Sequence, residues 1–216
     1  MNELSTFREE AKTKYSRYRH WEIFKILEAE LLTISRYINI TEDNFGTHSA
    51  ELSALILRIC TEIETLRKRI TGANDNGAAS EKLLALYPDI ACIVIKLPLW
   101  ALTFQPWKSL PDNKPEWWSA YESIKHDKLN CIVSGNLFSF LNSLSGLYAI
   151  LLFYERFFFG HKNDKGVETV DFEQDILVSS YFMPQADNIN YGRSFWTNNY
   201  FIQWQTEESS DTPEGA

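Results

Sequence analysis

Apolar residues recur every three or four positions along much of the first two thirds of the chain. One stripe predicts a helix over about 18–38 and contains Trp21, Phe24, Leu27, Leu31, Ile34 and Ile38. A second stripe contains Leu52, Ile56, Ile59, Ile63, Leu66 and Ile70. Capping candidates at 47–49 precede this second stripe, and Gly72 follows it. We therefore expect two amphipathic helices, with a loop at residues 74–77.

A third apolar segment carries no charge over the 24 residues from Cys131 to Tyr154. Its length is sufficient for a membrane span. Small and polar residues interrupt it, and at helical spacing they form a seam of Gly135, Ser139, Asn142, Gly146 and Ala149. Such a seam lets another backbone approach closely, in soluble proteins and in bilayers alike. We interpret the segment as a central buried helix, with a membrane span as the alternative.

The remaining segments are less regular. Residues 90–97 are short, β-branched and bounded by prolines, a pattern that fits either a helix or a strand. The proline- and tryptophan-rich stretch that follows resembles a connection packed over a core. After Gly160 the chain turns polar, with a strand-like stretch at 176–182 and an aromatic return at 200–204. The expected fold is mainly α, a helical bundle over 1–160 with minor strands near 90–105 and 176–204. A polar and aromatic extension (161–206) packs on the bundle, and a disordered acidic tail (207–216) follows it.

Composition narrows the function classes. The formal net charge of −8 argues against broad electrostatic binding of nucleic acid. The excess acid lies late, since residues 1–72 hold 11 basic and 11 acidic side chains and residues 131–216 hold 4 and 11. A local basic cluster such as 67–69 therefore remains compatible with a focused contact, although a solvated helix face or helix end is the simpler interpretation. The three cysteines match no disulfide or zinc pattern and are expected as buried thiols in a cytoplasmic protein, and the N-terminus lacks the pattern of a secretory signal.

The only chemically suggestive cluster precedes the apolar segment. On a helix beginning near Pro115, Ser119, Glu122 and His126 share one face. Glu122 could orient the His126 imidazole for proton transfer, and Lys125 and Lys128 would place positive charge where a phosphate could dock. The alternative is an ordinary helix end, where cationic side chains complement the helix dipole.

The aromatic residues of the same segment also have two interpretations. Trp117, Trp118 and Tyr121 could stack on nucleic-acid bases, or they could form part of a packed core. A pocket lined by Trp100, Trp107, Trp117 and Trp118 is a further alternative, without a signature that names its ligand.

The order of these features resembles bacterial helical proteins of the HEPN class (higher eukaryotes and prokaryotes nucleotide-binding). The resemblance covers about 18–155. It consists of a helix with Ser49 near its start and Glu62-Ile-Glu64 towards its end, the segment Trp117-Trp118-x-x-Tyr121-x-x-Ile124-Lys125-His126, and a long apolar helix. It implies a compact helical bundle that dimerises. It also implies metal-independent endoribonuclease or RNA-binding activity in a toxin–antitoxin or antiphage defence system.

Members of that class pair an arginine with a histidine four to six residues later, and both protomers contribute. This chain has no arginine near 119–121, and the basic residue adjacent to His126 is Lys125. Lysine lacks the planar fork of guanidinium, so the exchange is not neutral at a phosphate. The expected catalytic residues are His126, Lys125 and Glu122, and the expected RNA-binding residues are Lys128, Trp118 and Tyr121. No metal or cofactor is expected. The competing hypothesis is a non-catalytic module that dimerises or docks in a larger protein complex.

Overall fold

The fold was analysed in a computed structural model, which describes residues 14–110, 114–127, 131–163, 167–172, 179, 181–186, 189–193 and 200–204. Within these residues the protein is mainly α, with small strands, as the sequence predicts. The expected acidic tail at 207–216 lies outside the described residues.

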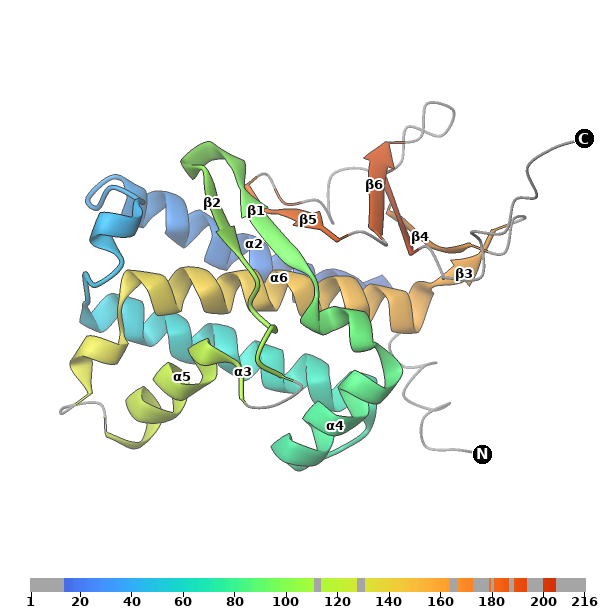
Figure 1. Ribbon diagram of the computed structural model, residues 1–216, viewed down its shortest axis with the longest axis horizontal. Helices are drawn as coiled ribbons and strands as arrows, with labels where there is room; N and C mark the ends of the chain where they lie inside the picture. Colours follow the sequence, from blue (N-terminus) through green and yellow to red (C-terminus); the bar gives the residue numbers. More distant parts are fainter. Residues whose placement is uncertain are drawn as a thin grey trace, which may run out of the picture.

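The uncharged segment forms the central helix α6 (Leu137–Phe159), which runs through the middle of the molecule in Figure 1. Asn136 caps its first turn by accepting a hydrogen bond from the Ser139 amide at 2.9 Å. The helix is long and apolar enough to cross a membrane, but 94% of its most apolar window is buried inside the fold. That environment is typical of the core helix of a soluble protein.

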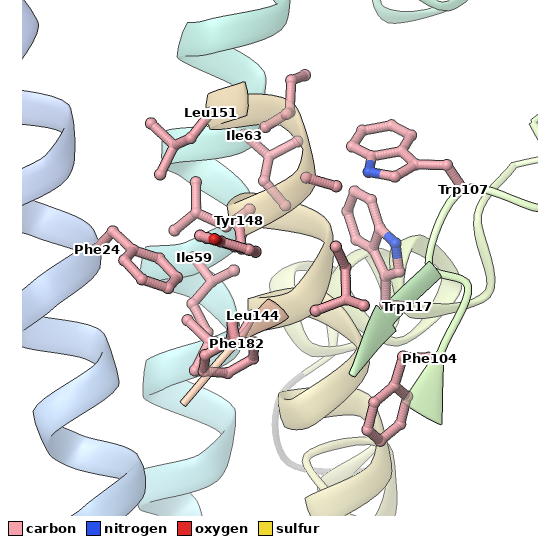
Figure 2. Packing of buried hydrophobic residues seen from close by; sticks show 14 of the residues in the cluster. Phe24, Ile59, Ile63, Phe104, Trp107, Trp117, Leu144, Tyr148, Leu151 and Phe182 are labelled. Carbon is pink, nitrogen blue, oxygen red and sulfur yellow. The ribbon is translucent and has the colours of Figure 1, made fainter. Parts of the chain in front are cut away.

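Two long helices flank α6, as the apolar stripes predict. Helix α2 spans Lys14–Ser35 and α3 spans Ala50–Thr71. Ser49 caps α3 at its start, and Gly72 ends it in the left-handed conformation at φ 65°. Figure 2 shows how Phe24 of α2, Ile59 of α3 and Tyr148 of α6 meet in one core.

The predicted loop at 74–77 is correct for its first two residues and wrong for its last two. Asn76 begins another helix, α4 (Asn76–Leu86), and Asp75 caps it by accepting from the Ala78 amide at 2.9 Å. Asparagine and glycine are unusual in a first helical turn, and this composition concealed the helix start.

The ambiguous segment after Tyr87 contains both kinds of structure. A 3-10 turn at Pro88–Ala91 leads into strand β1 (Val94–Leu97), which pairs antiparallel with β2 (Leu102–Phe104). Between them Pro98–Trp100 turns the chain, and Ala101 adopts a positive φ of 54°. In Figure 1 this hairpin lies across α6, and Trp107, which follows it, is buried in the core.

The chain after Gly160 adds small strands to the bundle. Strand β5 (Met183–Gln185) pairs with β1, which makes a sheet of order β2-β1-β5. A second sheet, of order β3-β4-β7-β6, comprises His161–Lys162, Glu168–Phe172, Tyr200–Trp204 and Ile189–Arg193. Trp204 packs against Phe153 of α6, and Arg156 forms 2.9 Å ion pairs with Asp89 and Glu168. Strand β7 lies within the region near 176–204 where minor strands are expected, whereas the strand-like stretch at 176–182 falls mainly on residues outside the described set.

The seam of α6 is occupied from within the same chain. A Cβ added at Gly146 would meet the Trp117 indole nitrogen at 3.2 Å, and Trp107 donates a hydrogen bond to the Gly146 carbonyl at 3.1 Å. A Cβ at Gly135 would lie 1.9 Å from the Ser53 hydroxyl oxygen. The small residues therefore admit side chains of α5 and α3.

The cysteines do not all meet the expectation of burial. Cys60 is buried in α3, and burial raises the pKa of its thiol. Cys131 is half-buried and Cys92 is exposed. Cys92 ends the 3-10 turn at Pro88–Ala91, and Cys131 precedes the turn Ile132–Ser134. In such turns an apolar neighbour in the sequence does not show whether the thiol itself reaches the core.

Candidate functional site

Helix α5 (Glu116–His126) carries most of the predicted site, and its two faces differ sharply. Trp117, Trp118, Tyr121 and Ile124 are buried, while Lys125 and His126 are exposed in the last turn. The helix begins directly after Pro115, which occupies the cap position, as the sequence predicts for a helix beginning near Pro115. Periodic apolar residues thus anchor α5 to the bundle, and this anchoring leaves its cationic end in solvent.

The aromatic side chains are packed rather than open. Trp117 is fully buried, edge-on to Trp107 at 5.3 Å, and Trp118 and Tyr121 are each only 3% exposed. Exposed stacking platforms were one of the two interpretations of the sequence, and the structure supports the packing interpretation. Trp117 contacts both Trp107 and Trp118, whereas Trp100 packs against Tyr181 at 5.7 Å, and of the four only Trp118 lines the cavity described below.

A hydrogen-bonded chain holds Lys125. Its Nζ donates to Tyr121 Oη at 3.3 Å and lies 5.1 Å from the centre of that ring. Tyr121 Oη in turn donates to Glu64 Oε1 at 3.4 Å, and Asn76 Nδ2 donates to the same oxygen at 3.3 Å. The hydrogen bond with Tyr121 raises the pKa of the Lys125 ammonium, because it favours the charged form.

Glu122 is not hydrogen-bonded to His126 as predicted. Both of its carboxylate oxygens accept from Lys114 Nζ at 2.9 Å, and this pairing lowers the pKa of Glu122. His126 acts on Glu122 only as a nearby charge. The prediction counted spacing along one helix, and it therefore missed a partner that precedes the helix.

The predicted residues are therefore only partly brought together. Lys125 and His126 are consecutive and both exposed in the last turn of α5, Tyr121 accepts a hydrogen bond from Lys125, and Glu122 pairs with Lys114. Lys128 lies outside the described residues. A few residues further on, Ile132 and Val133 are 47% and 60% exposed. The Cys131 amide donates a hydrogen bond to the Asp127 carbonyl at 3.0 Å, which ties this turn to the end of α5. An exposed apolar turn thus adjoins the cationic helix end.

Arg67 is a residue that the sequence interpretation missed. It is 2% exposed and lies with its guanidinium carbon 4.6 Å from the centre of the Trp118 ring. Nη1 donates to Ser80 Oγ at 3.1 Å and Nη2 to Asn76 Oδ1 at 2.8 Å, while Nε has no hydrogen-bond partner among the described residues. Burial lowers its pKa. The signal was present, since Ile63, Arg67 and Ile70 have the spacing of one helix face.

A cavity of about 450 Å³ lies beside this arginine. Its walls come from α3, from the first part of α4, and from α5 with three residues that precede it. The lining residues are Arg67, Asp75, Asn76, Gly77, Ser80, Glu81, Leu110, Lys114, Pro115, Trp118 and Glu122. Lys125 and His126 do not line this cavity, but Glu122 lies one helical turn before His126.

Metal chemistry has no evident centre in the described part of the chain, where no three histidine, cysteine or acidic side chains cluster. Comparison of the protein with family models, with curated proteins and with solved structures gives no match.

Proposed function

We propose that the protein is a HEPN-like, metal-independent endoribonuclease that acts in the cytoplasm as part of a bacterial toxin or antiphage defence system. The observation that carries the proposal is the exposed pair of Lys125 and His126, one a fixed cation and the other a side chain suited to proton transfer. The placement within the HEPN class and the biological role rest on the sequence resemblance.

The chemistry requires a base, an acid and a positive charge. The His126 imidazole takes the proton of a ribose 2′-hydroxyl, the 2′ oxygen bonds to phosphorus, and the bond from phosphorus to the 5′ oxygen breaks. The leaving 5′ oxygen takes a proton from an imidazolium, which a second copy of His126 can supply in a dimer. Alternatively, His126 of one protomer is the acid that protonates the leaving 5′ oxygen, and the second copy takes the proton of the 2′-hydroxyl. The Lys125 ammonium offsets the negative charge that develops on the phosphorane oxygens.

Support for Lys125 in this role comes from its anchoring. Tyr121 and Glu64 limit the freedom of a side chain that otherwise has four rotatable bonds. A preorganised cation stabilises a transition state better than a mobile one, because less reorganisation accompanies the reaction. This anchoring compensates in part for the missing guanidinium.

Cleavage of RNA in a chelator tests the proposal. Purified protein is expected to cleave single-stranded RNA in excess EDTA, and His126→Ala is expected to lower the rate by about 100-fold or more, the usual size of a general acid–base contribution. His161→Ala is the matched control, because His161 is also exposed but lies on β3 at the other end of α6. Equal loss in both variants, or no loss in His126→Ala, contradicts the assignment.

A non-catalytic interaction module is the second candidate, and the exposed Ile132 and Val133 favour it. Apolar side chains at such exposure suit an interface that covers them. We expect a homodimer in light scattering of the wild type and a monomer for Val133→Asp, with unchanged circular dichroism. If Val133→Asp abolishes function in cells while His126→Ala is silent, the module is the better description. A monomeric wild type without a partner argues against it.

A further inference from the structure

The cavity beside Arg67 combines donors and acceptors in a way that restricts its occupant. Its walls carry Arg67 and Lys114 as cations and Asp75, Glu81 and Glu122 as carboxylates. A free phosphate or other compact anion meets three carboxylates and is disfavoured. A purely apolar ligand would leave these charges without partners.

Much of this polar wall is already fixed. Asp75 caps α4, and Arg67 is held by Ser80 and Asn76 against the Trp118 indole. The guanidinium carbon lies 4.6 Å from the centre of the indole, and both side chains are almost fully buried, so this pair shapes the wall of the cavity and offers no open face for stacking. Among the described residues Arg67 Nε has no hydrogen-bond partner although the side chain is 2% exposed, and buried donors in proteins are normally paired.

The Lys114–Glu122 pair supplies a specific pattern. A carboxylate beside an ammonium presents acceptors next to a donor. Lys114 Nζ lies 2.9 Å from both Glu122 oxygens, and each oxygen keeps a further lone pair for a ligand. Guanine is the neutral base whose edge matches this pattern, since N1–H and the 2-amino group donate to a carboxylate while O6 and N7 accept from a cation. Adenine and cytosine offer an amino donor without a second adjacent donor.

We propose that this cavity, enclosed by α3, α4 and α5, binds a guanine base of the RNA substrate, with Glu122 and Lys114 reading its edge. The volume of about 450 Å³ lies in the range of small-molecule and nucleotide sites. The inference rests on the proposed RNA-directed function. The cavity belongs with that site because its lining includes Glu122, which lies one helical turn before His126. It assigns Glu122 to substrate recognition instead of to proton transfer.

Calorimetric titration of the full chain with mononucleotides tests the assignment. GMP is expected to bind about tenfold or more tightly than AMP, CMP or UMP, and IMP, which lacks the 2-amino group, is expected to fall about tenfold below GMP. Glu122→Gln should weaken GMP by a similar factor, because an amide replaces one acceptor with a donor. Glu116→Gln, an acidic residue on the same helix outside the cavity lining, should leave binding unchanged.

Equal binding of all four nucleotides, no binding of any, or no effect of Glu122→Gln overturns the guanine assignment. Titration with an oligouridine that contains a single guanosine tests whether the ligand is RNA or a free nucleotide. Binding of GMP without binding of this oligonucleotide contradicts a subsite for the RNA substrate. Titrations repeated in His126→Ala keep the two proposals apart. Guanine binding without any RNA cleavage rejects the nuclease, whereas cleavage without guanine binding rejects only this subsite.

Discussion

At the scale of single residues, the account depends on where Lys125 places its charge. The ammonium is exposed, yet Tyr121 and Glu64 connect it to the interior of the bundle. The same carboxylate oxygen of Glu64 receives Asn76, which holds Arg67. A surface cation and a buried one therefore belong to a single hydrogen-bonded network.

Removing one hydroxyl should reveal this network. In Tyr121→Phe the pKa of Lys125 is expected to fall towards the ordinary lysine value, because the acceptor that favours its charged form is lost. Titration of the lysine side chains by NMR measures the shift, with the other lysines as internal references. RNA cleavage should fall in the same variant, since the cation loses its fixed position.

The sign of any pH effect follows from the direction of the shift. A lysine whose pKa is raised in the folded state stabilises the fold below its unfolded pKa, and this contribution is lost as the pH rises through the folded pKa. The interaction is solvent-exposed, so its effect on stability is small, and the titration itself is the readout. An unchanged Lys125 pKa in Tyr121→Phe would contradict the network.

At the scale of elements, the seam of α6 explains how the site helix is held. Gly146 faces the indole of Trp117, and Trp117 Nε1 donates to the Pro106 carbonyl at 2.9 Å. The close approach therefore fixes α5 and the connection that precedes it against the central helix. The seam serves packing within one chain.

A bulky residue in the seam should act on stability and not on assembly alone. Gly146→Leu is expected to lower the free energy of unfolding by about 1–3 kcal/mol, the usual cost of overpacking. Gly146→Ala should cost less, because helix propensity favours alanine while the 3.2 Å contact opposes it. Urea denaturation measures both variants. Wild-type stability in Gly146→Leu would show that the seam is open to a partner.

The elements that could be predicted from the sequence are those in which the apolar periodicity continues over more than two or three helical turns. Leu52 to Ile70 gave α3 with its Ser49 cap, and the uncharged segment gave α6 as a buried helix. The hairpin of β1 and β2 was ambiguous because its strands are four and three residues long. Helix α4 was missed because Asn76 and Gly77 resemble a loop.

For the candidate site, sequence order revealed neighbours along one helix and nothing across the fold. Lys125 and His126 are consecutive at the end of a helix, and both are exposed there. The partners of Glu122 and Tyr121 are Lys114 and Glu64, and these contacts depend on how the chain enters α5 and where α3 crosses it. Arg67 was assigned to a solvated basic run although its spacing matched the buried face of α3.

At the scale of the whole molecule, one end of the bundle gathers the candidate chemistry. The cationic end of α5, the apolar turn at 131–134 and the cavity beside Arg67 all border α5 and the segments that adjoin it. Strands β3, β4 and β6 lie towards the C-terminal end of α6 (Figure 1), where Arg156 of α6 joins Glu168 of β4 to Asp89 and lies over the Tyr87 ring. The described strands of the C-terminal part thus pack on the core at a distance from α5.

The most direct test of the central claim is the chemistry of the cleaved ends. Mass spectrometry of a defined RNA oligonucleotide cleaved in EDTA should show 2′,3′-cyclic phosphate or its hydrolysis product on one fragment and a 5′-hydroxyl on the other. These ends follow from attack by the 2′ oxygen with His126 as the proton-transferring group. Methylation of the 2′ oxygen should abolish the products, and His126→Ala should lower their rate of formation by about 100-fold or more. Fragments with 5′-phosphate ends, or the same products from His126→Ala at the wild-type rate, would contradict the account.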